Sequence, residues 1–409
     1  MNNILPEELK QLAAVFPSPL YVVGGTVRDY IAGLIPAVRD WDICAPAPFS
    51  RVLECAQSLG FTLTAQYAAT GSLKLTFGGV GYEFTSFRTD TYSGCGHAPE
   101  KVVFTDDICA DARRRDFTCN AVYYDICAGQ FVDPLGGIEH IRARKLVPCA
   151  PAAKLFSEDA QRILRLARFA GELNFVADDE CILAARDCAD GLSGLSPAIS
   201  WRELSAMFGA DEKYGLAGGC KRSLGVLDQT GALGRVFPAV AALGQNAVAR
   251  AVAAAGRAPA GLRLHAFLYA LGGQKAEEAL EVYPLPKQFR IHLSRLIDAA
   301  RFAGRGTKVR AFVRENNDVF SDVCAFRRAA VGGGAADGWE QTRRIMLQEG
   351  VPMNAADLAV RGEDLINAGV PQAKTGQAIA FLLDKCLKDG SLNNKTALIA
   401  LAKQHYRVK

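Results

Sequence analysis

The feature that most restricts the fold of this chain is a change in hydrophobic pattern near residue 150. Before it, short runs rich in β-branched and aromatic residues, among them YVVGG, GSLKLTF and YEFTSF, predict strands, and stretches at 27–33 and 50–58 predict helices. From Lys154 onward, apolar residues recur at helical spacing. The sequence therefore predicts an α+β protein with a mixed N-terminal head and an all-α remainder, whose first long helix would be N-capped by Ser157.

Composition sets broad limits on what the chain can be. With 409 residues, half of them hydrophobic and 22% charged, it is long enough for several packed domains and is not largely disordered. The formal net charge of +4 is too small to indicate a nucleic-acid partner by itself. Its 12 cysteines form no CxxC pair, which favours reduced thiols. Because a signal-peptide pattern and a run of about 18 apolar residues are both lacking, we expect a cytoplasmic protein without a membrane span.

The first candidate site is the segment VVGGTVRD. A short strand ends in Gly24 and Gly25, and a helix is predicted to begin directly after them. Paired glycines let a backbone approach a phosphate, helix N-terminal amides face an anion, and Arg28 one turn later can contact that anion with two N–H groups. The segment therefore predicts a triphosphate cradle, although the same pattern also occurs in turns that bind nothing.

A pair of acids follows in the segment RDWDI. Asp40 and Asp42 are two positions apart, so on a strand their carboxylates point to the same face. Carboxylates held close together repel one another unless a cation lies between them, and oxygen ligands suit Mg²⁺. Glu83, in the strand-like YEFTSF, is a candidate third acid or else a partner that orients Arg88. The alternative for the pair is a solvated strand edge.

Five segments taken together resemble a known family. In order they are VGGTVRD, RDWDI, YEFTSFR, RRRDFTCNA and EDAQRILRLARF, and they span residues 21–175. The set is similar to the class II tRNA nucleotidyltransferases, or CCA-adding enzymes, and to the related bacterial poly(A) polymerases, which share a DNA polymerase beta-like head. The resemblance implies a catalytic head at 1–145, a helical neck at 146–207, a helical body at 208–310 and a helical, tRNA-binding tail at 311–409.

The resemblance also implies roles for residues of the head. Asp40 and Asp42 would bind Mg²⁺, and the glycine turn with Arg28 would bind the triphosphate of CTP or ATP. The RNA 3′-hydroxyl would then attack the α-phosphate and displace pyrophosphate. In the arginine cluster of RRRDFT, which by itself is compatible with a solvated patch, Arg115 would contact the nucleotide and Asp116 would orient its neighbours.

The segment EDAQR carries the most specific chemistry. Cytosine and adenine each present a ring-nitrogen acceptor beside an amine donor, whereas uracil and guanine present the reverse. An Asp that accepts from the amine and an Arg that donates to the ring nitrogen would therefore select C and A. By its resemblance to the family motif, Asp159 with Arg162 is the base-reading pair and Glu158 supports it. At helical spacing of three, the pair is equally compatible with an intrahelical salt bridge.

Two further arginines follow on the same predicted helix. Arg165 and Arg168 drift around the helix axis relative to Arg162, so they are expected to meet triphosphate or RNA backbone rather than the base. The alternative for both is a charged helix face. The stretch at 88–104 predicts a long mobile loop, which in the family is linked to the change from C to A addition. The alternatives to CCA addition are a poly(A) polymerase, an enzyme that adds only part of CCA, and a non-catalytic RNA-binding relative.

Overall fold

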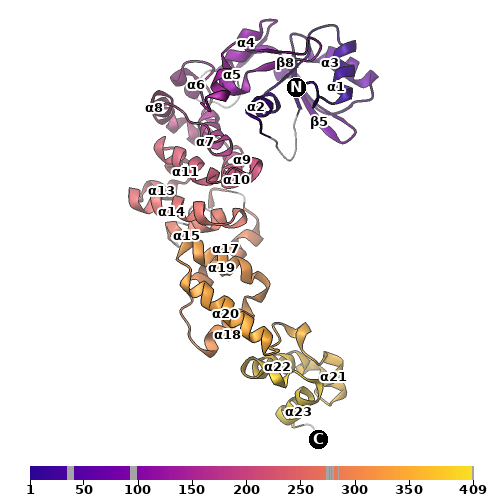
Figure 1. Ribbon diagram of the computed structural model, residues 1–409, viewed down its shortest axis with the longest axis vertical. Coiled ribbons are helices and arrows are strands. Elements are labelled where there is room, and N and C mark those ends of the chain that lie inside the picture. The colour runs from indigo at the N-terminus through magenta and orange to yellow at the C-terminus, as the bar shows by residue number, and fades with distance from the viewer. Residues whose placement is uncertain are drawn as a thin grey trace. The chain divides into compact units, whose positions relative to one another are not determined.

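The computed structural model describes residues 1–34, 41–92, 99–272, 276, 278, 281–283 and 285–407 (Figure 1). The chain forms two compact units, Met1–Gly256 with Leu271–Pro284 and Arg257–Ala270 with Leu285–Lys409. Strands lie in the first unit, and the described elements of the second are helical, so the predicted α+β class is confirmed. Within the described ranges, every cysteine is free and no helix is both long and apolar enough to cross a bilayer.

A seven-stranded mixed sheet is the centre of the head, in the order β3-β4-β5-β2-β1-β8-β9. Its strands are β1 (Tyr21–Val23), β2 (Trp41–Ala45), β3 (Thr62–Tyr67), β4 (Ser72–Phe77), β5 (Val80–Ser86), β8 (Tyr123–Asp125) and β9 (Gln130–Val132). Among these described strands, β2 and β5 form the one parallel pair, with Asp42 opposite Glu83. The sheet therefore brings two acids that are far apart in sequence onto neighbouring strands.

Helices cover this sheet. They are α1 (Glu7–Val15), α2 (Gly25–Ala32), α3 (Phe49–Ser58), α4 (Ile108–Arg113) and α5 (Gly137–Arg142). Helices α1 and α3 pack together, with α3 against β3, β4 and β5, whereas α2 packs against β1 and α5 (Figure 1). The buried side chains of Val23, Cys44, Phe87 and Tyr123 form a core at the β1 and β2 side of the head. Burial of these apolar groups fixes the position of the β1–α2 turn.

The stretch at 88–104, which was predicted to be a loop, contains two paired strands. Strands β6 (Arg88–Thr91) and β7 (Lys101–Phe104) pair antiparallel, and residues 93–98 between them lie outside the described part. Arg88 is held at the start of β6 by an ion pair of 2.9 Å with Asp90. The loop prediction was wrong for both strands, because the charged RTDT segment gains cross-strand partners that its composition does not reveal.

The helical part of the first unit comprises α6 (Ala152–Glu158), α7 (Gln161–Leu173), α8 (Asp179–Asp187), α9 (Pro197–Phe208), α10 (Ala210–Tyr214), α11 (Gly219–Gln229), α12 (Ala232–Val236), α13 (Pro238–Ala241) and α14 (Gln245–Arg257). Helices α7 and α11 pack so closely that a Cβ on Gly171 would lie 2.6 Å from the Gly219 carbonyl oxygen. Ser157 lies inside α6, so the prediction that it caps the first long helix was wrong. The break comes instead at Asp159 and Ala160.

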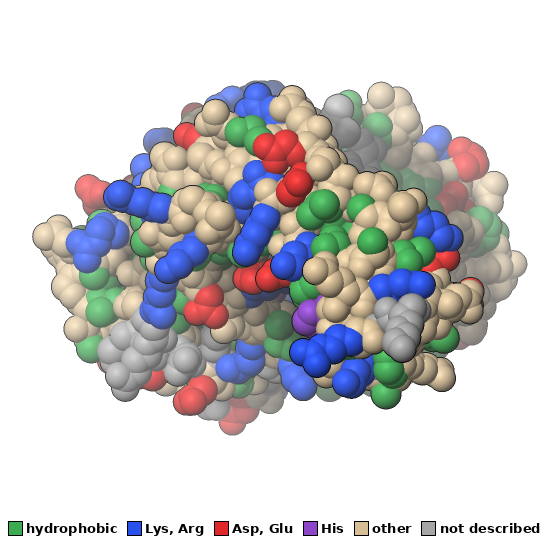
Figure 2. Space-filling view, turned by 90° about the horizontal axis from the view of Figure 1, so that it is seen from below, with side chains coloured by type: hydrophobic (Ala, Val, Ile, Leu, Met, Phe, Trp, Pro, Cys, Tyr) green, Lys and Arg blue, Asp and Glu red, His purple; other side chains and the backbone are tan. Residues whose placement is uncertain are grey.

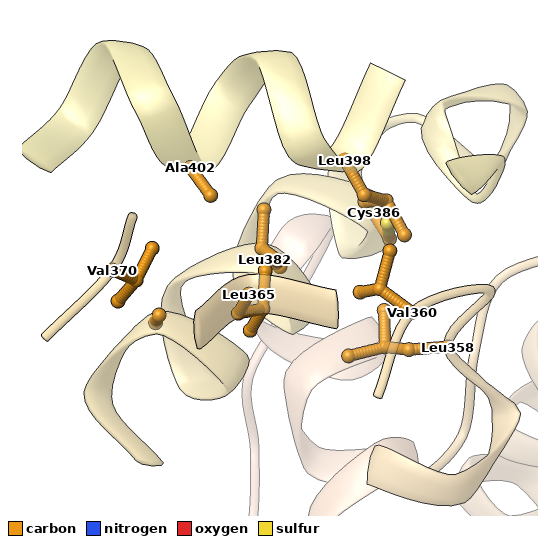
Figure 3. Packing of buried hydrophobic residues seen from close by; sticks show 9 residues of the cluster. Leu358, Val360, Leu365, Val370, Leu382, Cys386, Leu398 and Ala402 are labelled. Atoms are coloured by element: carbon orange, nitrogen blue, oxygen red, sulfur yellow. The ribbon is translucent and has the colours of Figure 1, made fainter. Parts of the chain in front are cut away.

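The second unit contains α15 (Arg263–Leu271), α17 (Lys287–Arg301), α18 (Thr307–Glu315), α19 (Phe320–Ala330), α20 (Gly334–Gln348), α21 (Gly362–Asn367), α22 (Thr375–Lys388) and α23 (Lys395–Tyr406). Near the C-terminus, α21, α22 and α23 share a small apolar core, in which Leu365 lies beside Leu382 and Leu398 lies beside Cys386 (Figure 3). This core contains no titratable carboxylate or amine, which is typical of packing rather than of a site.

Candidate active site

A cavity of about 690 Å³ lies in the first unit. Its lining comes from four places: the β1–α2 turn, strands β2 and β5, the segment that follows α4, and helices α7, α9 and α10. Ten of the lining side chains are arginines, aspartates or glutamates on the head or on α7, Asp159 just before α7 adds another acid, and two more cations come from α9 and α10. The cavity is therefore suited to a highly charged ligand.

The β1–α2 turn forms one wall of the cavity. Gly24 adopts φ 77° and ψ −142°, a conformation that side chains disfavour, and Gly25 begins α2. A Cβ on Gly24 would lie 2.7 Å from Oδ2 of Asp42. The missing side chain thus lets the turn approach the Asp42 carboxylate, and the N-terminus of α2 opens toward the same space.

Asp42 and Glu83 occupy the wall formed by the sheet. They are register partners on the parallel strands β2 and β5, and both line the cavity. Glu83 also forms an ion pair of 3.2 Å with Lys74, and Arg88, the other partner considered for it, pairs with Asp90. Asp40 lies outside the described residues. Among the residues that are described, no three His, Cys, Asp or Glu side chains gather as a metal site. The carboxylate oxygens that are present suit a hard cation such as Mg²⁺.

Arg28 lies behind the glycine turn and is almost completely buried. Its Nε and Nη2 donate to Oδ1 of Asp29 at 2.9 and 2.7 Å, its Nη1 donates to Oδ1 of Asn120 at 2.7 Å, and its Nη2 donates to the Tyr214 hydroxyl at 3.0 Å. These bonds engage four of the five N–H groups of a guanidinium. Arg28 lines the cavity, but this arrangement does not provide the two-point phosphate contact that the sequence predicted.

Helix α4 and the segment that follows it hold two buried carboxylates, Asp111 and Asp116. Asp111 accepts from Arg115 at 2.9 Å and from the Tyr123 hydroxyl at 2.7 Å. Burial would raise the pKa of Asp111, but the guanidiniums of Arg115 and Arg114 outweigh burial and lower the pKa to about 2. Arg115 lines the cavity from this anchored position.

Asp116, which follows Arg115 in the chain, connects the head to α7 through hydrogen bonds. It accepts from Nε of Arg165 at 2.6 Å and from Nδ2 of Asn120 at 3.1 Å. Burial opposes ionisation of Asp116, yet Arg165 and these hydrogen bonds lower the pKa to about 2. The orienting role expected for Asp116 is compatible with these contacts.

The proposed base-reading pair lies at the break between α6 and α7. Asp159 has extended backbone and its Oδ1 accepts from the amide of Gln161 at 2.9 Å. Arg162, in the first turn of α7, donates from Nη1 to the Leu155 carbonyl at 3.0 Å and from Nη2 to the Arg114 carbonyl at 2.9 Å. Both side chains line the cavity. The expectation that they share one helix was wrong, because Asp159 precedes α7.

The remaining predicted residues also lie near this break. Glu158, the last residue of α6, is 3.4 Å from Nη1 of Arg162. Arg165 and Arg168 both line the cavity from α7, each over the ring of Phe169. Arg168 pairs with Glu203 of α9 at 2.7 Å and with Glu172 at 3.2 Å. Buried acids on three elements thus hold the arginines of α7 in place.

Comparison with known proteins agrees with this geometry. Residues 20–147 match the model of the poly(A) polymerase head domain. The CCA-adding enzyme of Geobacillus stearothermophilus is 30% identical over 386 residues, which are 92% of this chain and 90% of that enzyme. This chain belongs to the CCA-adding enzyme family.

Other family members match over different lengths. The CCA-adding enzyme of Lactococcus lactis subsp. lactis (strain IL1403) is 31% identical over 223 residues. The matched region is 52% of this chain and 54% of that enzyme, so this chain spans about half the length of that relative. Among solved structures, the Bacillus stearothermophilus CCA-adding enzyme in complex with CTP has a TM-score of 0.73 at 24% identity, covering 98% of both chains. The Thermotoga maritima CCA-adding enzyme complexed with tRNA has a TM-score of 0.69 at 17% identity, covering 98% of this chain and 94% of that one. The family fold therefore extends over nearly the whole chain.

Several residues of the cavity in this CCA-adding family member were not found from the sequence. Arg202 on α9 and Lys213 and Tyr214 on α10 line it beside Asn120 of the head. No local motif marks Arg202, Lys213 or Tyr214, since each lies on a helix whose pattern indicates only packing. Asn120 lies within RRRDFTCNA, and its place in that segment was the available indication.

Proposed function

We propose that this chain adds the sequence CCA to the 3′ end of tRNA, taking the nucleotides from CTP and ATP without a nucleic-acid template. The observation that carries the proposal is the register of Asp42 with Glu83 beside the Gly24 turn, in a cavity that is also lined by the arginine-bearing helix α7. Membership of the CCA-adding family supports it. Strand acids and several arginines in one cavity suit a metal-bound triphosphate.

Asp42, with Asp40, would hold Mg²⁺, and Glu83, the register partner of Asp42, would be a third acid beside them. Bound there, a divalent metal lowers the pKa of the RNA 3′-hydroxyl and offsets charge on the α-phosphate and the departing pyrophosphate. The chain itself positions the reactants. The amide N–H groups of Gly24 and Gly25 would donate hydrogen bonds to phosphate oxygens. Arg165 and Arg168 would offset the negative charge of the triphosphate.

The base would be selected at the start of α7. The Asp159 carboxylate would accept from the amine of cytosine or adenine, while Arg162 would donate to the adjacent ring nitrogen. Two carbonyls, those of Leu155 and Arg114, hold the Arg162 guanidinium in a fixed plane. A fixed donor geometry makes the reversed pattern of uracil or guanine costly, because the buried groups would then face like partners.

The expected partner is tRNA, bound through its shape and phosphates. Relatives of the same fold have been solved with tRNA, with ATP and with CTP, which supports this expectation. On the face drawn in Figure 2, Lys and Arg side chains are numerous and lie among acidic ones. A partner of this kind and reduced thiols both fit a cytoplasmic location.

The test is to incubate the protein with tRNA that lacks its 3′ CCA, in the presence of Mg²⁺ and each NTP, and to sequence the products. Addition of C, C and A in order is expected with CTP and ATP together. Long tails from ATP alone would instead establish poly(A) synthesis, and arrest after one or two C residues with both nucleotides present would establish a partial enzyme.

Replacing the metal-site acid separates catalysis from binding. Asp42→Asn should abolish incorporation while the affinity for tRNA stays within about threefold of wild type, because phosphate contacts dominate RNA affinity. Glu54→Gln, on the exposed face of α3, is the matched control and should leave incorporation unchanged. Full turnover by Asp42→Asn would remove the metal assignment.

A further inference from the structure

One hydroxyl group connects helix α10 to α2, the helix that begins at the glycine turn. The Tyr214 hydroxyl donates to Oδ2 of Asp29 at 2.7 Å and accepts from Nη2 of Arg28 at 3.0 Å. Tyr214 lies 186 residues beyond Arg28 in the chain. Burial and the Asp29 carboxylate both raise the pKa of Tyr214, so the phenol keeps the proton that it donates. Its donor and one acceptor site are therefore both engaged by α2.

Helix α10 is itself fixed relative to α7. The Asp211 carboxylate at its start accepts from the amides of Gly218 and Cys220 at 2.6 and 2.7 Å, which ties α10 to the beginning of α11. Helix α11 in turn packs backbone against backbone on α7 at Gly171. The place of Tyr214 is thus determined by α7, the helix that carries Arg162, Arg165 and Arg168.

A second series of hydrogen bonds also connects α2 to α7. Arg28 donates to Asn120, Asn120 donates to Asp116, and Asp116 accepts from Arg165 of α7. The guanidinium of Arg28 also lies 5.4 Å from the ring centre of Phe169 on α7. Loss of one link alone therefore weakens the connection between α2 and α7 without abolishing it.

We infer that Tyr214 is a positioning residue, which holds the Gly24–Gly25 phosphate turn at a fixed separation from the base-reading start of α7. This inference rests on the proposed function, since it assigns the triphosphate to one end of this separation and the base to the other. A nucleotide that bridges both ends places its α-phosphate correctly only when their separation is fixed. Tyr214 acts through Arg28 and Asp29, so it affects the reaction rate rather than the choice of base.

The decisive variant is Tyr214→Phe, which keeps the ring and removes only the hydroxyl. Tyr30→Phe is the matched control, because Tyr30 lies on α2 two positions after Arg28 with its ring against Phe131 and 39% of its surface exposed. The measurements are the single-turnover rate of C addition to tRNA lacking CCA, the equilibrium Kd for CTP, and the ratio of CTP to UTP incorporation. Rates are compared well below the melting temperature of each variant.

For Tyr214→Phe we expect a fall of about tenfold in the single-turnover rate, with the Kd for CTP within about twofold of wild type, since misplacement of reacting groups lowers rate more than binding. The preference for CTP over UTP should not change. Tyr30→Phe should match wild type in all three measurements.

Three results would overturn the inference. An unchanged rate would show that the separation does not depend on the hydroxyl. A loss found entirely in the Kd for CTP would make Tyr214 a direct contact of the nucleotide, and a changed CTP to UTP ratio would make it part of base selection. A wild-type protein that incorporates neither CTP nor ATP would overturn the proposed function itself, and that result is distinguishable because it precedes any comparison of variants.

Discussion

At the scale of single residues, the cavity is organised by the absence of one side chain and by buried carboxylates. Gly24 leaves room for the Asp42 carboxylate, and Asp111, Asp116 and Glu203 each hold an arginine that lines the cavity. Buried ion pairs of this kind cost free energy to desolvate, so they contribute orientation more than stability. Their effect is to present cations that do not have to reorganise when a triphosphate binds.

Gly24→Ala tests the close approach of the turn to Asp42. The added Cβ would lie 2.7 Å from Oδ2 of Asp42 on a backbone with φ 77°. We expect nucleotide incorporation to fall by at least about 100-fold, because either the turn or the carboxylate must shift by the order of an ångström. Gly33→Ala is the control, since Gly33 has φ 69° at the other end of α2 but no atom within 4 Å of its Cβ position. Equal losses of activity in both variants would assign the effect to backbone strain alone.

The lowered pKa of the buried Asp111 carboxylate leads us to expect that the stability of the protein depends on pH. This pKa is lowered from 3.8 to about 2, so the unfolded state binds more protons between these values. The stabilisation is complete above about pH 4 and is lost as the pH falls toward 2, with a contribution of about 2 kcal/mol to the free energy of unfolding. Urea denaturation at a series of pH values from 5 to about 2.5 measures this slope.

Asp111→Asn removes one of two carboxylates whose pKa is lowered to about 2, so it should reduce that slope without abolishing it, because Asp116 still titrates. It should also lower stability at neutral pH, because Arg114 and Arg115 lose a buried partner. Glu54→Gln at the surface should keep the slope of wild type. A slope in Asp111→Asn equal to that of wild type would contradict the prediction and assign the whole effect to other carboxylates, of which Asp116 is the first candidate.

At the scale of elements, the sequence predicted those that carry strong local patterns. The strand YVVGG, the strand β2 that carries Asp42 and the helical period after Lys154 were all found, because strand alternation and helical spacing are local properties. The break at Asp159 was missed because an N-cap preference at Ser157 competes with a helix that already begins after Pro151. The cross-strand pairing of Asp42 with Glu83 was anticipated only as a possibility, since register between distant strands is set by tertiary packing.

The same limit applies to the site. Motifs located the residues of α7 and of the glycine turn, but the contacts of Arg28 depend on Asn120 and on Tyr214, which the chain brings together over 92 and 186 residues. Contacts of this length have no local pattern. The sequence therefore predicted which residues line the cavity better than it predicted which of their donor groups are already hydrogen-bonded within the protein.

The packing of α7 on α11 gives a prediction at this scale. In Gly171→Ala the new Cβ would lie 2.6 Å from the Gly219 carbonyl and 3.1 Å from Cβ of Ser223, so the helices must separate. We expect the free energy of unfolding to fall by about 2–4 kcal/mol, measured by urea denaturation. Gly225→Ala, in the interior of α11 with nothing within 4 Å, should instead stabilise by about 0.5–1 kcal/mol. A neutral Gly171→Ala would contradict the close backbone contact.

At the scale of the whole molecule, the proposed partner, tRNA, is a polyanion, whereas the net charge of the chain is only +4. Binding to tRNA should therefore depend on local groups of Lys and Arg and should weaken steeply with salt, by about 10- to 1000-fold in Kd between 50 and 200 mM. Filter binding or fluorescence anisotropy across this range checks the slope. Binding of CTP should weaken far less, since fewer phosphates are contacted, and equal slopes for both ligands would argue against an extended RNA surface.

The path of the chain between its two compact units has a practical consequence. The backbone passes from one unit to the other after residues 256, 270 and 284, so each unit is assembled from two stretches of sequence. No single cleavage or truncation point can then release either unit whole, because a chain that stops at Gly256 lacks Leu271–Pro284 and one that starts at Leu285 lacks Arg257–Ala270. Exchange of the C-terminal half with that of a relative would have to preserve both interleaved stretches, whereas a simple end-to-end fusion would leave each partner with a missing piece.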